Sequence, residues 1–381
     1  MSDLTMIRSL ARCGAADAAW MAFEGAGLAA RSDNAAILSL KGRLLKDRAM
    51  RADGAERLHL LRAAADAYGA AARLDNATYP RINAATLLYL RGDKAAAGVM
   101  ANDVLAMLDA GDHDAETPYW IEATRAEALL LLGRLAEAQR AMHAAMAAAP
   151  GAREDRAATL RQFRRLLAAD GADDGWLAPF AVGPVMAFRG PIGISAGNDA
   201  ERIRAAVRSC APAMAVGALA AGADIIAAEA AIEHGAALHI ILPAPPDVFR
   251  AASVAPQAGH WTARFDALLD AAEQVEWLNE PDGFSQGAMH LAETMVDGLA
   301  KAEAQALESR AVTLKVMRMS KPNELDNDDL ADTMVVRVEG DANHDARLLG
   351  VGAVRQSELC RRQRPFAARR GPALEAVREV K

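Results

Sequence analysis

Small residues recur at fixed intervals through the first half of the chain, and this recurrence constrains the fold more than any other feature. The clearest copy lies within residues 119–150. Its recurring positions, spaced 3, 4, 5, 4, 3 and 5 residues apart, are Ala126, Leu129, Gly133, Ala138, Met142, Ala145 and Pro150. Small side chains allow two helices to cross closely, so this pattern predicts a pair of packed helices that ends near the proline.

Three earlier segments repeat the pattern. Their matching residues are Gly14, Ala19, Phe23 and Ala26 in the first copy, Gly42, Leu45, Ala64, Tyr68, Ala71 and Asn76 in the second, and Ala85, Leu88, Gly92, Ala97, Ala101 and Val104 in the third. The second copy carries about ten extra residues around 51–60. Four degenerate copies resemble a tetratricopeptide-like α-solenoid, with a generic alanine-rich helical bundle as the alternative.

The same register predicts which side chains line the concave groove of such a solenoid. They are Tyr79, Ile82, Thr86 and Tyr89 in the third repeat and Trp120 and Glu127 in the fourth. Exposed aromatic side chains on a concave face suit the capture of a protein or peptide partner. The alternative is that they pack against the second half of the same chain.

Charge and composition exclude several classes of protein. The net charge of −7 argues against nucleic acid as the main partner. Cys13, Cys210 and Cys360 lie far apart and predict neither a disulfide framework nor a metal site. The sequence shows no signal peptide and no apolar run long enough for a membrane span, so we expect a cytoplasmic protein without a membrane partner.

The second half alternates short apolar runs with alanine-rich helical stretches. We expect strands at 185–188, 213–217, 238–242, 274–278, 312–316 and 334–338, and helices at 199–210, 223–234, 261–272 and 286–307. Strands that are apolar throughout predict a mostly parallel, doubly wound Rossmann-like sheet covered on both faces. The fold class is therefore α + α/β, with repeats over 1–170, a Rossmann-like domain over 171–345 and an irregular basic tail over 346–381.

Two glycine loops follow predicted strands, where such sheets bind their ligands. Gly190 and Gly193 lie in the first loop; the second contains Gly217, Ala218, Gly222, Ala223 and Asp224. Glycines and a helix start can cradle phosphate, although a tight structural turn explains the second loop equally well. Asp224 can cap the helix or repel a phosphate.

Glu229 lies beside the apolar stripe of the helix that starts at Ala223. A carboxylate there is either paired at the rim of the stripe or directed at a ligand, because burying it unpaired would be costly.

The stretch from Val185 to about Val316 resembles the SLOG superfamily of Rossmann-like domains, and with the repeats it is similar to bacterial tetratricopeptide-repeat proteins that carry such a domain. The resemblance rests on Phe188–Gly190, Gly222–Glu229, Leu242–Pro243 with Phe249 and Ser253–Val254, and Gly259–Phe265. It implies recognition of a nucleotide-like ligand by a sensor in signalling or defence. The family commonly has a histidine where this chain has Pro191, and the PGGxGT loop of its LOG-type enzymes is missing.

Relatives with this layout also occur ahead of class III nucleotide cyclases. A shifted reading frame over Val354–Phe366 would resemble the start of a cyclase domain, which suggests a frameshift in the tail. We therefore expect a non-catalytic signalling sensor or adaptor with no certain cofactor, which binds a nucleotide-like ligand and a protein partner. The alternatives are the regulatory half of a truncated cyclase, a nucleotide-hydrolysing enzyme with Glu229 as general base, and a scaffold that has lost its ligand.

Overall fold

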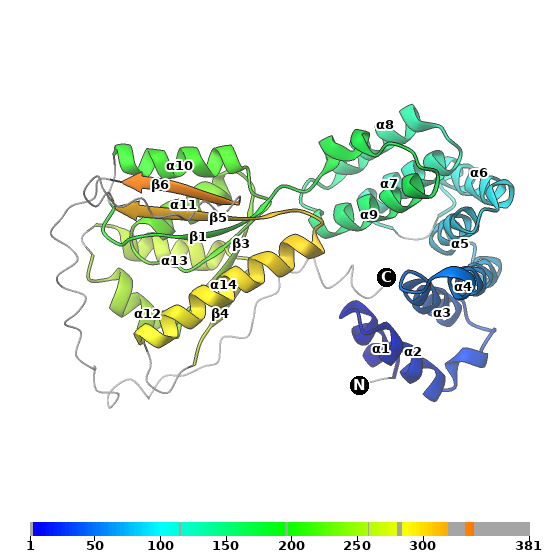
Figure 1. Cartoon of the computed structure of the whole chain (residues 1–381), viewed down its shortest axis with the longest axis horizontal. Coiled ribbons are helices and arrows are strands. Elements are labelled where there is room, and N and C mark those ends of the chain that lie inside the picture. Colours follow the sequence, from blue (N-terminus) through cyan, green and yellow to red (C-terminus); the bar gives the residue numbers. More distant parts are fainter. Residues whose placement is uncertain are drawn as a thin grey trace. The chain divides into compact units, whose positions relative to one another are not determined.

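The chain folds into two compact units, Met1–Ala181 and Val182–Lys381. The computed structural model describes residues 3–113, 116–194, 197–257, 259–279, 284–318 and 332–338. Figure 1 shows a helical first unit and a second unit built around a sheet. The expected tail, 346–381, and its proposed frameshift lie outside the described residues.

The first unit is a succession of antiparallel helix pairs. Its helices are α1 (Asp3–Arg12), α2 (Ala16–Gly25), α3 (Ala35–Ala49), α4 (Gly54–Leu74), α5 (Thr78–Leu90), α6 (Lys94–Ala110), α7 (Pro118–Leu131), α8 (Leu135–Ala148) and α9 (Arg153–Ala169), with a short 3₁₀ turn, η1 (Leu28–Ala30). Helices pack in the pairs α1/α2, α3/α4, α5/α6 and α7/α8, and each pair also contacts the next. This arrangement confirms the expected helical repeats.

The recurring small residues form the interior of these pairs. Side chains with no solvent exposure include Ala19, Phe23, Ala64, Tyr68, Ala71, Ala85, Ala97, Ala101, Ala126, Ala138, Met142 and Ala145. Alanine at a crossing allows the close helix approach that the pattern predicts, and the larger Phe23, Tyr68 and Met142 fill the remaining space. The extra residues of the second repeat are accommodated by an α4 of 21 residues.

The segment that follows α9 closes the last repeat. A 3₁₀ helix, η2 (Gly175–Phe180), follows α9. Its Trp176 ring centroid lies 6.2 Å from that of Phe163 on α9, and Phe180 lies 4.8 Å from the ring of His143 on α8. A solenoid needs its last apolar surface covered, and these aromatic side chains cover it.

The second unit contains a fully parallel six-stranded sheet. The strands are β1 (Val185–Arg189), β2 (Met214–Gly217), β3 (Ala237–Leu242), β4 (Gln274–Trp277), β5 (Ala311–Arg318) and β6 (Thr333–Val338). Their order is β4-β3-β2-β1-β5-β6, and each neighbouring pair is parallel. Each strand overlaps the one predicted from an apolar run, which confirms the α + α/β fold class.

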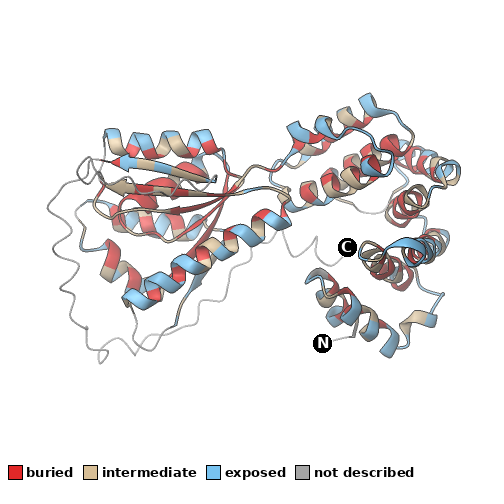
Figure 2. Ribbon diagram, in the orientation of Figure 1, coloured by how far each residue is buried: buried red, intermediate tan, exposed pale blue. Residues whose placement is uncertain are grey.

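Helices cover both faces of the sheet, as Figure 2 shows by the buried strands between half-exposed helices. They are α10 (Asn198–Cys210), α11 (Ala223–Glu233), α12 (Pro246–Phe249), the π-helical turn η3 (Arg250–Val254), α13 (Trp261–Ala271) and α14 (Gln286–Ala306). The steps β1 to β2, β2 to β3 and β3 to β4 move in one direction, so right-handed crossovers place α10, α11 and α13 on one face. The connection to β5 moves in the opposite direction and places α14 on the other face, against β1, β2, β3 and β5.

Candidate functional site

The strand order of the sheet reverses beside β1, and this reversal defines the candidate site. The chain moves outward from β1 through β4 and then returns to place β5 on the other side of β1. Crevices beyond the carboxyl ends of strands at such a switch point are the usual ligand sites of open α/β sheets. The candidate site therefore lies between the ends of β1 and β5.

The loop that follows β1 and the end of β5 meet at this switch point. β1 ends at Arg189 and is followed by the loop Gly190–Gly193, here called the first glycine loop. Arg189 is in register with Lys315, so β5 continues three residues further, to Arg318. The Arg318 side chain donates from Nη2 to the carbonyl oxygen of Ile192 at 2.8 Å, which fixes a guanidinium against the first glycine loop.

The second glycine loop, residues 218–222, crosses the first. Ile192 and Gly222 form an isolated antiparallel bridge. The Gly193 amide donates to the Ala221 carbonyl at 3.0 Å, and the Ala223 amide donates to the Pro191 carbonyl at 3.2 Å. Both loops are therefore held by backbone hydrogen bonds to each other.

The glycines permit the close approach of these loops. A Cβ atom at Gly222, whose φ is +132°, would lie 2.8 Å from the Pro191 carbonyl oxygen. At Gly190 it would lie 2.5 Å from the Cβ of Ala223. At Gly217, the last residue of β2, it would lie 2.5 Å from the Phe188 ring. At Gly217 and Gly222 this packing agrees with the structural alternative left open for the second loop, and Gly190 has the same role in the first loop.

The expected phosphate cradle of the second loop is consequently closed in this structure. The Ala220 amide donates to the Asp224 carboxylate at 3.3 Å, the Ala221 amide to the Ser253 carbonyl at 3.5 Å, and the Ala223 amide to Pro191. Ala218 is half-buried beside them. The physical reason is that two glycine loops at adjacent strand ends satisfy each other's backbone groups. The switch-point side, with Gly190, Gly193 and Arg318, is the better candidate for a ligand.

Asp224 lies beneath the crossing, in the first turn of α11, and is 6% exposed. Its Oδ1 is buried without a hydrogen-bond partner in the described part of the chain. Burial raises its pKa to about 7, against a smaller lowering by the amides of Ala220 and Gly190. The expectation that Asp224 caps α11 is wrong, because its carboxylate accepts from the amide of Ala220, which precedes the helix.

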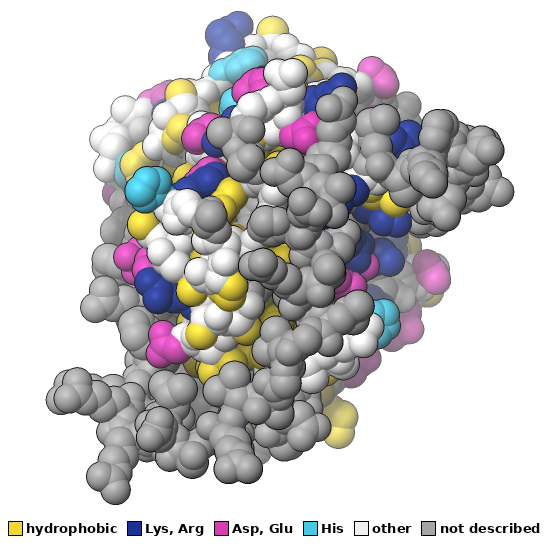
Figure 3. All heavy atoms as spheres, turned by 90° about the vertical axis from the view of Figure 1, so that its left-hand side faces the viewer, with side chains coloured by type: hydrophobic (Ala, Val, Ile, Leu, Met, Phe, Trp, Pro, Cys, Tyr) yellow, Lys and Arg dark blue, Asp and Glu magenta, His cyan; other side chains and the backbone are white. Residues whose placement is uncertain are grey.

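Charged side chains of α14 stand near the same strand ends. The Arg189 guanidinium binds both carboxylate oxygens of Asp297, at 2.7 and 2.9 Å. Glu293, one turn before Asp297, is exposed and contributes to the raised pKa of Asp224. Figure 3, viewed toward the strand ends, shows described basic and acidic side chains in small neighbouring groups.

Glu229 is placed away from this site. Its carboxylate accepts two hydrogen bonds from Arg264 of α13, both at 2.6 Å, and one from Arg204 of α10 at 3.4 Å. Arg264 also stacks on the Trp261 ring, 4.2 Å from its centroid. Glu229 therefore ties three helices together, which is the internal-pairing alternative, and the structure gives no support to a role as ligand contact or general base.

The six side chains expected on the groove of the repeats are mostly engaged within the repeats. Ile82 is 3% and Thr86 1% exposed, so the expectation of an open face is wrong for both. The reason is that α5 packs against both α7 and α9. The first helices of successive repeats therefore bury each other's inner surfaces. The aromatic members are half-buried: Tyr79 packs edge-on against Tyr68, Trp120 against Tyr119, and the Tyr89 hydroxyl donates to Asp170.

A polar track instead follows the first helices of the repeats. Lys46 of α3 donates to Asn83 of α5 at 2.8 Å. Glu127 of α7 accepts from the Thr86 hydroxyl and from Gln162 of α9, the latter at 3.0 Å. Burial lowers the pKa of Lys46, while Asp47 and Glu127 raise it. Lys46, Asn83 and Gln162 were not among the groove residues predicted from the sequence, although Lys46 and Asn83 lie on the first helices of predicted repeats.

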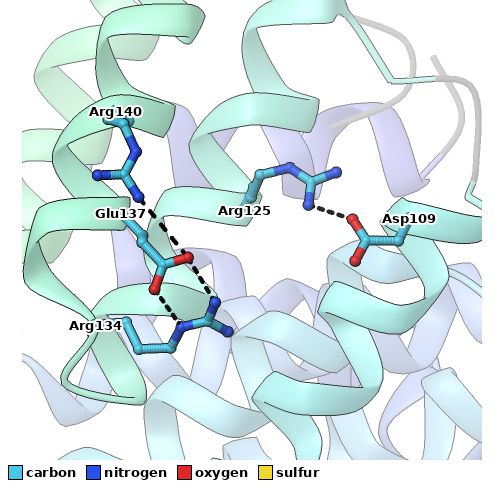
Figure 4. A network of polar contacts seen from close by, with 5 residues as sticks. All are labelled: Asp109, Arg125, Arg134, Glu137 and Arg140. Atoms are coloured by element: carbon cyan, nitrogen blue, oxygen red, sulfur yellow. Dashed lines mark hydrogen bonds and ion pairs between the residues drawn. The ribbon is translucent and has the colours of Figure 1, made fainter.

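Two further hollows lie between successive repeats. A groove of about 620 Å³ is bordered by α6, α7 and α8, and one of about 380 Å³ by α4, α5 and α6. Figure 4 shows the ion pairs that line the larger groove: Arg125 of α7 with Asp109 of α6 at 2.5 Å, and, at the start of α8, Glu137 with Arg134 at 2.6 Å and Arg140 at 4.0 Å. Because these charges are paired with one another, the larger groove shows no preference for one kind of ligand.

Among the described residues, no group of three or more metal-binding side chains is close enough to hold a metal ion. Within the same residues, no helix is long and apolar enough to cross a bilayer.

This is a repeat protein that carries a parallel α/β unit with a loop-lined switch point. Residues 4–88 match the model of the Tetratricopeptide Repeats-Sensor family. The chain thus contains tetratricopeptide repeats, and the match supports a signalling role through repeat-mediated interaction. A comparison with curated proteins finds no match.

Proposed function

We propose that the chain is a signalling adaptor whose repeats bind a protein partner and whose Rossmann-like unit binds a nucleotide-like ligand. The proposed binding of a protein partner is supported by the sensor-family match over residues 4–88 and by the polar track of α3, α5, α7 and α9. Side-chain amides and charges along such a track can hydrogen-bond the backbone of a bound segment. The proposed binding of a nucleotide-like ligand is supported by the resemblance of residues 185–316 to SLOG domains and by the arrangement of side chains and loops at the carboxyl ends of β1 and β5.

The meeting of Arg318 with the first glycine loop carries the ligand proposal. A guanidinium is the side chain best suited to phosphate, because it presents planar donors to two oxygens at once. Here it is held at the end of β5, 2.8 Å from the loop that ends β1, at the switch point of the sheet. A phosphate placed between Arg318 and Gly190–Gly193 would leave the nucleoside to extend over the strand ends.

The resemblance makes a class III nucleotide cyclase a candidate for the effector that such a sensor regulates. Turnover by the sensor itself has no comparable support, since the carboxylate expected to act as base, Glu229, is bound by two arginines.

Loss of Arg318 should weaken ligand binding about 10- to 100-fold, because a hydrogen-bonded ion pair of this kind contributes about 1.5–3 kcal/mol. The measurement is thermal stabilisation of the full chain by ATP, GTP, NAD, cyclic nucleotides and ADP-ribose, followed by titration calorimetry with the nucleotide that stabilises it most. The matched control is Arg208→Ala, at the far end of α10, where the arginine pairs with Glu201.

We expect the control to bind as the parent protein does. The proposal fails if none of these nucleotides stabilises the chain, which would favour a scaffold without ligand, or if Arg318→Ala and Arg208→Ala have equal effects.

A further inference from the structure

The crossing of the two glycine loops covers the carboxyl group of Asp224, in which one of the two oxygens lacks a hydrogen-bond partner among the described residues. Asp224 Oδ2 accepts from the Ala220 amide at 3.3 Å, whereas Oδ1 has no partner among the described residues and no contact with solvent. Directly above it, the hydrogen bonds Gly193 to Ala221 and Ala223 to Pro191 hold the loops together. A neutral carboxyl group tolerates such an environment, but a carboxylate there has one buried oxygen without compensation.

The neighbouring charges do not provide this compensation. Arg189, on β1, attracts the carboxylate, but its guanidinium already binds both oxygens of Asp297. Glu293, on α14, repels the carboxylate. Ionisation of Asp224 is therefore opposed by burial and by Glu293. It is favoured by the amides of Ala220 and Gly190 and, more weakly, by an arginine that is shared with another acid.

We propose that Asp224 is a proton-operated latch: its neutral form holds the two glycine loops closed, and its carboxylate loosens the crossing. This goes beyond the proposed function, and the latch operates whether or not a nucleotide binds. Burial raises the pKa of Asp224 to about 7, so the proton leaves near neutrality. Once the crossing opens, the carboxylate gains water and the amides of Gly193 and Ala223 lose their carbonyl partners.

The latch predicts a pH-dependent opening of the loops. An open loop lets the carboxyl ionise at its ordinary pKa, so each pH unit between about 4 and 7 favours opening by up to tenfold. Between pH 5 and pH 8 the protection of these amides against hydrogen exchange should fall roughly 100-fold, after correction for the intrinsic exchange rate. The measurement is hydrogen exchange by mass spectrometry on the full chain, for peptides that cover 190–194 and 218–224.

Three variants distinguish the latch from a general effect of pH. Asp224→Asn keeps the shape but cannot ionise, so its loop protection should not change with pH. Asp270→Asn removes an exposed carboxylate of α13 and should behave as the parent protein does. Glu293→Gln removes the repelling neighbour and should move the midpoint of the change to lower pH, by about half a unit.

The proposal is overturned if the parent protein shows the same loop protection at pH 5 and pH 8, or if Asp224→Asn retains the full pH dependence. Should Asp224→Asn not fold, Glu293→Gln decides, because an unchanged midpoint would contradict the assignment to Asp224.

Discussion

At pH 8 the Asp224→Asn variant should be more stable than the parent protein, with a free energy of unfolding of the second unit higher by about 2–4 kcal/mol. The folded state raises the pKa of this carboxyl to about 7, so it binds a proton more tightly than the unfolded chain does. The parent protein therefore loses stability as the pH rises from about 4 to about 7, and then levels off. Asparagine keeps an oxygen for the Ala220 amide and has no proton to lose.

The difference between the two proteins should be greatest above pH 7 and should vanish near pH 4. Guanidinium unfolding, followed by hydrogen exchange of peptides from β1 to β3, measures the second unit separately from the repeats. A stability difference that is the same at pH 4 and pH 8 would show that ionisation of Asp224 is not its cause.

Substitution of Gly190 by alanine should destabilise the second unit by about 2–4 kcal/mol. The added Cβ would lie 2.5 Å from the Cβ of Ala223 and 2.7 Å from the Cβ of Val316. Both are Cβ atoms fixed to backbone, one on α11 and one on β5, so neither can move by rotating a side chain. Relief of these contacts must separate the first glycine loop from both elements, and the same unfolding measurement detects the loss.

Gly298→Ala is the matched control for this substitution. Gly298 lies inside α14, and a Cβ there meets no atom within 4 Å. It should stabilise the unit by about 0.5–1 kcal/mol, since alanine favours a helix interior. Equal stabilities of the two variants would contradict the tight meeting of β1, α11 and β5 at Gly190.

The elements of the fold were predictable because their physical signals are local. β3 is a run of six buried residues ending at a proline, and such a run in a chain of alternating helices indicates a parallel strand. The repeats were predictable from small residues at fixed spacing, and those residues are buried. Even the insertion in the second repeat was visible, as an added length that α4 takes up as helix.

The site was less predictable because it depends on contacts between distant segments. The switch point lies near Arg318 because β5 is placed beside β1. This placement follows from the strand order of the whole sheet and leaves no pattern in the local sequence. The amides of the second loop were expected to be available, but their acceptors include Pro191 and Ser253, each about 30 residues away in sequence. Likewise, the partners of Glu229 lie 25 and 35 residues away.

The inner face of the repeats was also predictable only in part from the sequence. Register along each helix placed Thr86 and Glu127 on the groove side of their repeats, and in the structure their side chains hydrogen-bond to each other. Their burial depends on how closely α5, α7 and α9 approach one another, and this distance follows from packing of whole helices.

We expect a nucleotide-like ligand to bind at the switch point between β1 and β5. The most direct test of this binding is hydrogen exchange of the full chain with and without ATP or ADP-ribose at saturating concentration. We expect the nucleotide to add protection in peptides covering Val185–Gly193 and Ala311–Arg318, and we expect this added protection to be lost in Arg318→Ala. Protection by a bound nucleotide only in other peptides, with those two unchanged, would contradict it.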